Sequence, residues 1–111
     1  MNRIILVIAL CTLSIAAQAL ELSQEAIQGR WLIVKMGDMD TKELGLGEDI
    51  WEFRDNLWIV SSSGVAMKPE IFRIKGNEIV LGSHSIKVTD FSEGKMVTDS
   101  MGVVQELEKM K

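Results

Sequence analysis

The chain has 111 residues, with 12 Lys or Arg, 16 Asp or Glu and one histidine, which give a formal charge of −4. This length suits one small domain, and the acidic balance argues against binding nucleic acid or anionic lipid head groups through charge. The only cysteine, Cys11, lies in an N-terminal apolar segment, so the rest of the chain offers no disulfide and no thiolate metal ligand.

Residues 1–19 are predicted to be a secretory signal peptide. A positive start at Arg3 leads into the apolar segment 4–15, and Ala17-Gln18-Ala19 supplies the small residues that signal peptidase accepts. We expect cleavage after Ala19 and a periplasmic or secreted protein without stable membrane insertion. Removing 19 residues from 111 leaves 92, and because Arg3 is the only charged residue removed, the net charge becomes −5.

Two alternatives to a cleaved signal peptide remain. A membrane anchor needs about 20 apolar residues, and Gln18 and Glu21 end the apolar segment before that length. A lipoprotein would be lipidated on Cys11, but Leu10 stands where a small residue is expected.

Residues 20–111 are predicted to form one domain with a short N-terminal helix followed by strands. Residues 20–28 can form about one to two helical turns with Ser23 as the candidate N-cap, and Gly29 ends them. The apolar pattern then changes to period two, with turn residues every eight to twelve positions, which is typical of an antiparallel sheet. The expected strands are 30–36, 48–54, 57–62, 65–68, 70–75, 78–82, 85–90, 95–99 and 103–108, with 65–68 the weakest.

Asp55-Asn56 is a two-residue connection of the kind that accepts positive φ. A hairpin around it places Phe53 opposite Trp58 and Trp51 opposite Val60. The four apolar side chains then share one face of the sheet, which we expect to be the inner one.

Gly76-Asn77 gives a second hairpin by the same reasoning. It pairs Lys75 with Glu78, Ile74 with Ile79, and Phe72 with Leu81. The charged pair then points outward and the apolar pairs point inward, and Ile86 and Val88 continue the inner face with Lys87 outside.

Connections this short exclude parallel crossovers, so the strands are expected to form an up-and-down meander. A sheet with one apolar face either folds over as a sandwich or closes into a barrel. Closure removes exposed edges, and the sequence therefore favours an all-β antiparallel barrel.

The chain resembles a small bacterial lipocalin-like, or calycin-type, domain. The resemblance rests on Gly29-x-Trp31, on Trp51-Glu52-Phe53-x-Asp55-Asn56, on the 74–79 hairpin and on the late strand 103–107. It implies a closed barrel and a binding module, with Trp31 packed across the closed end. The family's late arginine, which covers that tryptophan, has Lys109 as its only counterpart here.

Aromatic residues of the inner face are the expected ligand-binding groups, because large flat side chains give a ligand contact area and shape. The alternative is that they simply fill the barrel, since eight strands enclose little free volume. The residues assigned to a small apolar ligand are Trp31, Trp51, Phe53, Trp58 and Phe72.

The longest irregular stretch, 37–47, lies where lipocalin-like barrels carry a lid. Met39, Leu44 and Leu46 are apolar residues that could cover a barrel mouth or contact a partner, and a self-packed Ω-loop is the alternative. The spacing of acids in this stretch does not fit a calcium loop, because Lys42 and Glu43 occupy the positions of an oxygen ligand and a glycine.

No catalytic constellation emerges from the sequence. Ser61-Ser62-Ser63-Gly64 and His84 lack a nucleophile elbow and an assigned orienting acid, so we expect neither enzymatic activity nor a cofactor or metal. The many acidic residues give an alternative function, in which the surface and the 37–47 loop bind a basic exported protein, as in an inhibitor or toxin-immunity protein. The same acids would also serve as a generic solubilising surface.

Overall fold

The computed structural model describes residues 21–43 and 47–111. The predicted signal peptide, its cleavage site, and Leu44 and Leu46 lie outside the described residues. The strands are β1 (Gly29–Met36), β2 (Met39–Asp40), β3 (Asp49–Arg54), β4 (Leu57–Ser62), β5 (Val65–Ala66), β6 (Glu70–Ile71), β7 (Arg73–Lys75), β8 (Glu78–Val80), β9 (Ser85–Ser92), β10 (Lys95–Ser100) and β11 (Val103–Lys109).

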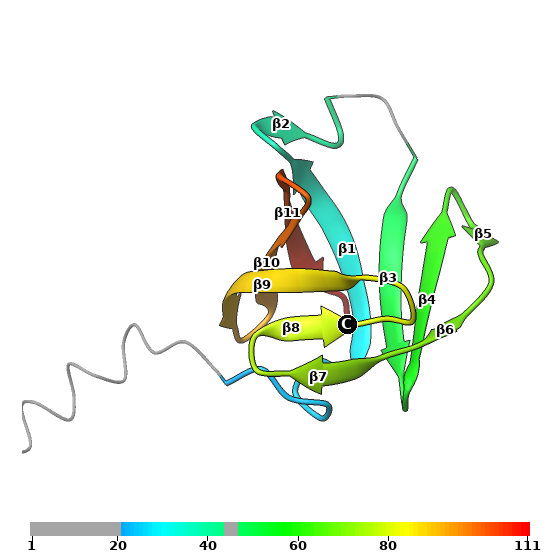
Figure 1. The fold of residues 1–111 in the computed structure, drawn as a ribbon. Helices are drawn as coiled ribbons and strands as arrows, with labels where there is room; N and C mark the ends of the chain where they lie inside the picture. Colours follow the sequence, from blue (N-terminus) through cyan, green and yellow to red (C-terminus); the bar gives the residue numbers. More distant parts are fainter. Residues whose placement is uncertain (1–20, 44–46) are drawn as a thin grey trace, which may run out of the picture.

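The strands form one antiparallel sheet in meander order, as predicted. The order is β5-β4-β3-β1-β11-β10-β9-β8-β7, with β2 paired to β1 and β6 paired to β4. The first long strand, β1, pairs with the last, β11, in the middle of the curled sheet (Figure 1). Most strand ends lie within two residues of their predicted positions, and β2 was not predicted.

The predicted closed barrel is wrong: the sheet is an open half-barrel (Figure 1). Closure would require one strand over 70–75 to pair with β4 and β8 along its whole length. That segment instead divides at Phe72, so that β6 pairs only with β4 and β7 pairs only with β8. Pro69 cannot donate a backbone hydrogen bond, and it stands immediately before this divided segment.

The first predicted hairpin is confirmed in register. Phe53 pairs with Trp58 and Trp51 with Val60 across β3 and β4. Asp55 occupies the turn with a φ of 57°, the left-handed conformation that Asp and Asn tolerate better than most residues.

The second predicted hairpin is confirmed for the two pairs nearest its turn. Lys75 pairs with Glu78 and Ile74 with Ile79, but the ladder ends before Phe72. The Phe72 N–H donates to Asn56 O at 2.9 Å, in the first hairpin's turn. Phe72 therefore stays buried, as predicted, while its backbone joins the two hairpins instead of extending the second.

The predicted N-terminal helix is wrong: residues 24–27 form a hydrogen-bonded turn and not a helix. The Ser23 hydroxyl accepts a hydrogen bond from the Ala26 N–H at 3.0 Å, so the predicted cap is present, and Ile27 N–H donates to Ser23 O at 3.1 Å. The turn ends before Gly29, whose φ of 120° is not helical. The Gln28 side chain bonds the turn of the first hairpin: its Oε1 accepts from Asp55 N–H at 2.7 Å and its Nε2 donates to Asp55 O at 2.8 Å. Within the described part of the chain there is no helix.

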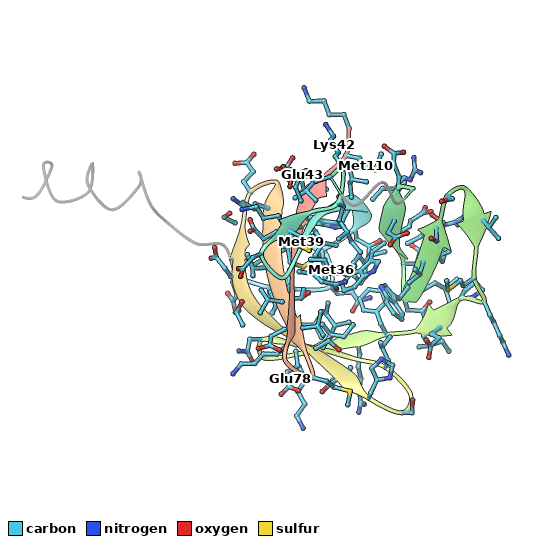
Figure 2. The ribbon with its side chains drawn as sticks, turned by 90° about the horizontal axis from the view of Figure 1, so that it is seen from above. Met36, Met39, Lys42, Glu43, Glu78 and Met110 are labelled. Carbon is cyan, nitrogen blue, oxygen red and sulfur yellow. The ribbon has the colours of Figure 1, made fainter. Side chains whose placement is uncertain are left out.

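Apolar side chains from both walls of the curl meet in one core. In Figure 2 the half-barrel is seen along its length, with Met36 and Met39, paired across β1 and β2, over one end. The turn around Ile27 covers the opposite end. The buried core comprises Ile27, Trp31, Ile33, Trp51, Phe53, Phe72, Ile79, Leu81, Ile86, Val88, Phe91, Met96 and Leu107.

Candidate functional site

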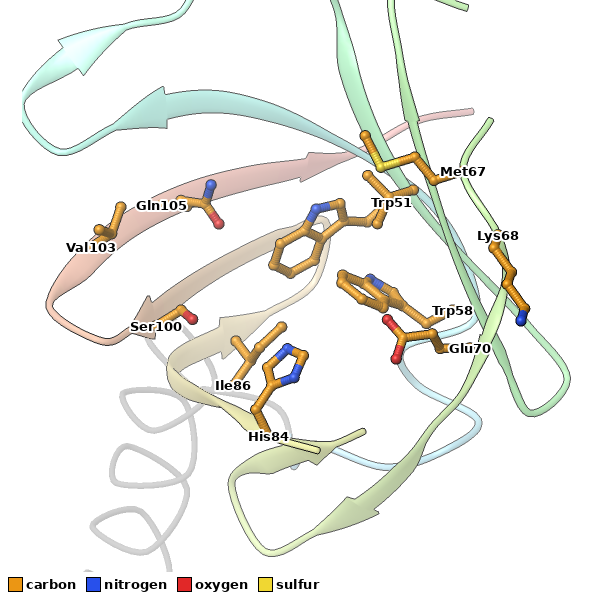
Figure 3. A pocket seen from close by; sticks show the side chains of 11 residues that line it. Trp51, Trp58, Met67, Lys68, Glu70, His84, Ile86, Ser100, Val103 and Gln105 are labelled. Carbon is orange, nitrogen blue, oxygen red and sulfur yellow. The ribbon is translucent and has the colours of Figure 1, made fainter. Parts of the chain in front are cut away.

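A pocket of about 430 Å³ lies on the open side of the half-barrel. One wall comes from β3 and β4, the other from β9, β10 and β11, and the segment 67–70 and the loop before β9 border it (Figure 3). The lining residues are Trp51, Trp58, Val60, Met67, Lys68, Glu70, His84, Ile86, Ser100, Val103 and Gln105.

The wall from β3 and β4 is aromatic. Trp51 and Trp58 pack edge to face, with ring centroids 5.5 Å apart and an interplanar angle of 85°. Val60, the cross-strand partner of Trp51, extends the same apolar surface toward the mouth. A flat apolar ligand would therefore meet two indole rings held in fixed orientation by the hairpin.

The facing wall carries polar side chains. Ser100 and Gln105 line the pocket from β10 and β11 (Figure 3). Thr98, the cross-strand partner of Gln105, lies directly behind them and is 0% exposed. Its hydroxyl has no hydrogen-bond partner, which is uncommon for a buried polar group.

The indole N–H of Trp58 is the second buried polar group without a hydrogen-bond partner among the described residues. Tyr and Trp polar groups usually find a partner when buried. Two unpartnered hydrogen-bonding groups therefore lie at or beside this pocket, on opposite walls.

Charged and titratable residues border the mouth. Lys68 and Glu70 flank Pro69 on one side, and His84 faces them from the loop before β9 (Figure 3). The His84 ring contacts Ser83, with Nδ1 3.3 Å from Oγ. Of the serines at positions 61–63, Ser62 does not face this pocket: its hydroxyl donates a hydrogen bond to Asp49 Oδ1 at 2.6 Å.

The five aromatic residues predicted to bind a ligand divide into two groups. Trp51 and Trp58 line the pocket, whereas Phe53 and Phe72 pack against each other beneath it, with ring centroids 5.0 Å apart and an interplanar angle of 74°. These two phenylalanines are buried in the core and do not border the pocket.

Trp31 lies at the other end of the half-barrel. Its Nε1–H donates to Ile27 O at 2.9 Å, and its ring lies 5.8 Å from that of Phe91. Lys109 Nζ stands 5.6 Å from the Trp31 ring centroid, within reach of a cation–π interaction. Gly29 permits this approach, because a Cβ there would lie 2.9 Å from Lys109 Cε.

The predicted lid residue within the described part, Met39, is not among the residues that line the pocket. It pairs with Met36 in β2 and is 53% exposed. Met39 therefore lies over one end of the half-barrel and away from this pocket, and its role as a lid stays a prediction.

Several acids of the predicted negative surface have structural partners. Glu106 lies 3.7 Å from Lys35 Nζ and 3.5 Å from Lys95 Nζ, and Glu52 lies 3.4 Å from Arg54 Nε. Over residues 21–43 and 47–111, no group of three His, Cys, Asp or Glu side chains could hold a metal ion. No helix in this same part of the chain is long and apolar enough to cross a membrane.

Sequence reasoning missed the polar wall. The signal was available, because alternation along β10 and β11 places Thr98, Ser100 and Gln105 on the same face as the buried Met96 and Leu107. Lys68 and His84 carry no such signal, since they lie in loops, and Glu70 lies in the two-residue strand β6, which is too short to show alternation.

Comparison with protein-family models, with curated proteins and with solved structures finds no match to this chain. The chain itself establishes an all-β antiparallel meander sheet curled into a half-barrel, with an aromatic and polar pocket on its open side.

Proposed function

We propose that this chain is a non-enzymatic binding protein that holds a small, largely apolar ligand between Trp51 and the β9–β11 wall. The observation that carries the proposal is the pocket of about 430 Å³ with two orthogonal tryptophans on one wall. Its volume falls in the range of about 300 to 1,000 Å³ that is typical of small-molecule sites.

The half-barrel is further proposed to be a reduced lipocalin-like barrel. Meander order, pairing of β1 with β11, and the stacking of Lys109 on Trp31 support this relationship. In this view, one end is packed shut around Trp31 and the ligand enters through the gap between β6 and the loop before β9.

Binding of N-phenyl-1-naphthylamine, a neutral apolar fluorophore, tests the proposal. We expect saturable one-to-one binding that quenches tryptophan emission. Trp58→Ala should weaken it by about tenfold or more, because the variant removes one aromatic face of the site. Trp58 is only partly buried, so most of the fold should persist.

Ile71→Ala is the matched control, because Ile71 is a large apolar residue of β6 that is 68% exposed and does not line the pocket. This variant should bind the probe as the wild type does. Absence of saturable binding to the wild type would contradict the proposal, as would equal affinity of Trp58→Ala and the wild type.

Export is proposed from the leader sequence 1–19. Mass spectrometry of the intact exported protein should give the mass of a chain that begins at Leu20. A protein retained in the cytoplasm with residues 1–19 attached would contradict this part of the proposal.

A second candidate function is binding of a basic exported protein by the rim near β2. Gly37 N–H donates to Val104 O at 2.7 Å, which places the start of the 37–47 loop beside the β10–β11 hairpin. Met101, at the tip of that hairpin, is fully exposed, and Met39, Val103 and Val104 are exposed too. A basic partner held here should be lost at high salt and with Met101→Ser, and its retention under both changes would contradict this candidate.

A further inference from the structure

We propose that the ligand is a neutral, planar ring compound that carries at least one hydrogen-bond-accepting oxygen. Its ring would pack on Trp51 and Trp58, and its oxygen would receive hydrogen bonds from the polar groups of the pocket. This inference rests on the proposed binding function and narrows its ligand class.

The inner face of the β10–β11 hairpin changes from apolar to polar along its length. Met96 pairs with Leu107, and both are completely buried. The next inward pair toward the pocket is Thr98 with Gln105, followed by Ser100 with Val103.

Polar side chains at inward positions oppose burial unless they have hydrogen-bond partners. Thr98 Oγ1 has none, and among the described residues no hydrogen bond joins the Ser100 or Gln105 side chain to another group. A ligand that enters the pocket would displace water from Ser100 and Gln105, so it must replace those hydrogen bonds to bind well.

The donor capacity of the pocket points to an acceptor on the ligand. The Ser100 hydroxyl and the Gln105 amide line the pocket, and both can donate a hydrogen bond. A carbonyl, ether or hydroxyl oxygen on the ligand could accept from them, whereas a pure hydrocarbon would leave them unpaired.

The charges at the mouth favour a neutral ligand. Lys68 and Glu70 carry opposite charges on the same short segment, and both border the pocket. Because these charges offset each other, the mouth does not select strongly for an anion or a cation.

A pair of probes of nearly equal shape tests this inference: 2-acetylnaphthalene, which has a carbonyl oxygen, and 2-ethylnaphthalene, which has none. We expect the wild type to bind the acetyl compound at least threefold more tightly. Gln105→Leu should weaken binding of the acetyl compound by about threefold to tenfold and leave the ethyl compound within twofold.

Glu108→Leu is the matched control for Gln105→Leu, since it places the same side chain on the outer face of β11. It should leave both affinities within twofold of wild type. Near-ultraviolet circular dichroism of each variant reports whether the tryptophan packing is retained.

The outcomes separate this inference from the proposed function. Equal affinity of the wild type for the two compounds would overturn the inference while leaving the binding function in place. If Gln105→Leu weakened the binding of both compounds equally, the inference would also be overturned, because the Gln105 side chain would then act through the fold and not through the ligand's oxygen. If the wild type bound neither naphthalene compound nor N-phenyl-1-naphthylamine, the binding function itself would be overturned.

Discussion

Phe53→Ala is expected to lower the free energy of unfolding by about 3 to 5 kcal/mol. Phe53 is 1% exposed, and its ring centroid lies 5.0 Å from that of Phe72 and 6.4 Å from that of Trp51. It thus joins the β3–β4 hairpin to the segment that divides into β6 and β7. Removing the ring leaves a cavity where these parts of the half-barrel meet.

The loss is large against the total stability available. A disulfide-free domain of this size has an unfolding free energy near the low end of the usual range, about 5 kcal/mol. Urea unfolding followed by far-ultraviolet circular dichroism should therefore show Phe53→Ala largely unfolded, or with a midpoint close to zero denaturant.

The neighbouring residue supplies the control. Arg54→Ala removes an exposed side chain whose Nε lies 3.4 Å from Glu52 Oε2, and an exposed ion pair of this kind contributes little. Its unfolding free energy should stay within about 0.5 kcal/mol of wild type. A Phe53→Ala protein within about 1 kcal/mol of wild type would contradict the packing described for this core.

Trp31→Ala is expected to cost a similar amount, about 3 to 5 kcal/mol. The Trp31 ring is 1% exposed, contacts Phe91 and lies under Lys109 Nζ, so its removal opens the closed end of the half-barrel. The same change removes the donor to Ile27 O and leaves that carbonyl without its partner.

Two milder variants separate the contributions at this end. Trp31→Phe keeps an aromatic ring but loses the hydrogen bond to Ile27 O, so a loss of about 1 to 2 kcal/mol is expected. Lys109→Ala removes the ammonium group and the aliphatic chain that carries it from the ring face, and should cost about 1 kcal/mol. If all three variants had the same urea unfolding midpoint as the wild type, the packing of Trp31 at this end would be contradicted.

The registers of both hairpins were predictable because short turns determine cross-strand pairing. Asp55-Asn56 and Gly76-Asn77 each fixed which residues face each other, and alternation then assigned the inner side chains. Such local chemistry needs no information from distant parts of the chain.

Whether the barrel closes depends on contacts between residues far apart in the sequence, which local patterns do not specify. The Phe72 N–H bonds Asn56 O, which lies 16 residues earlier in the chain and in the turn of the other hairpin. Similarly, the Gln28 side chain bonds the Asp55 backbone 27 residues away, a contact that no local pattern indicates.

The candidate site was only half predictable for a related reason. Alternation gives the face on which a side chain lies but not its depth, so Phe53 and Trp58 were equivalent in the sequence although one fills the core and the other lines the pocket. The polar wall was missed because the inward rows of β10 and β11 were not followed from Met96 to Ser100.

The three indole N–H signals in a two-dimensional ¹H–¹⁵N spectrum test the central claim most directly. Assigned by single Trp→Phe variants, they report on the pocket through Trp51 and Trp58 and on the packed end through Trp31. During titration with N-phenyl-1-naphthylamine, the signals of Trp51 and Trp58 should shift to saturation together while that of Trp31 stays in place. A shift confined to Trp31, or no shift of any indole signal at saturating probe, would contradict a ligand site on the open side of the half-barrel.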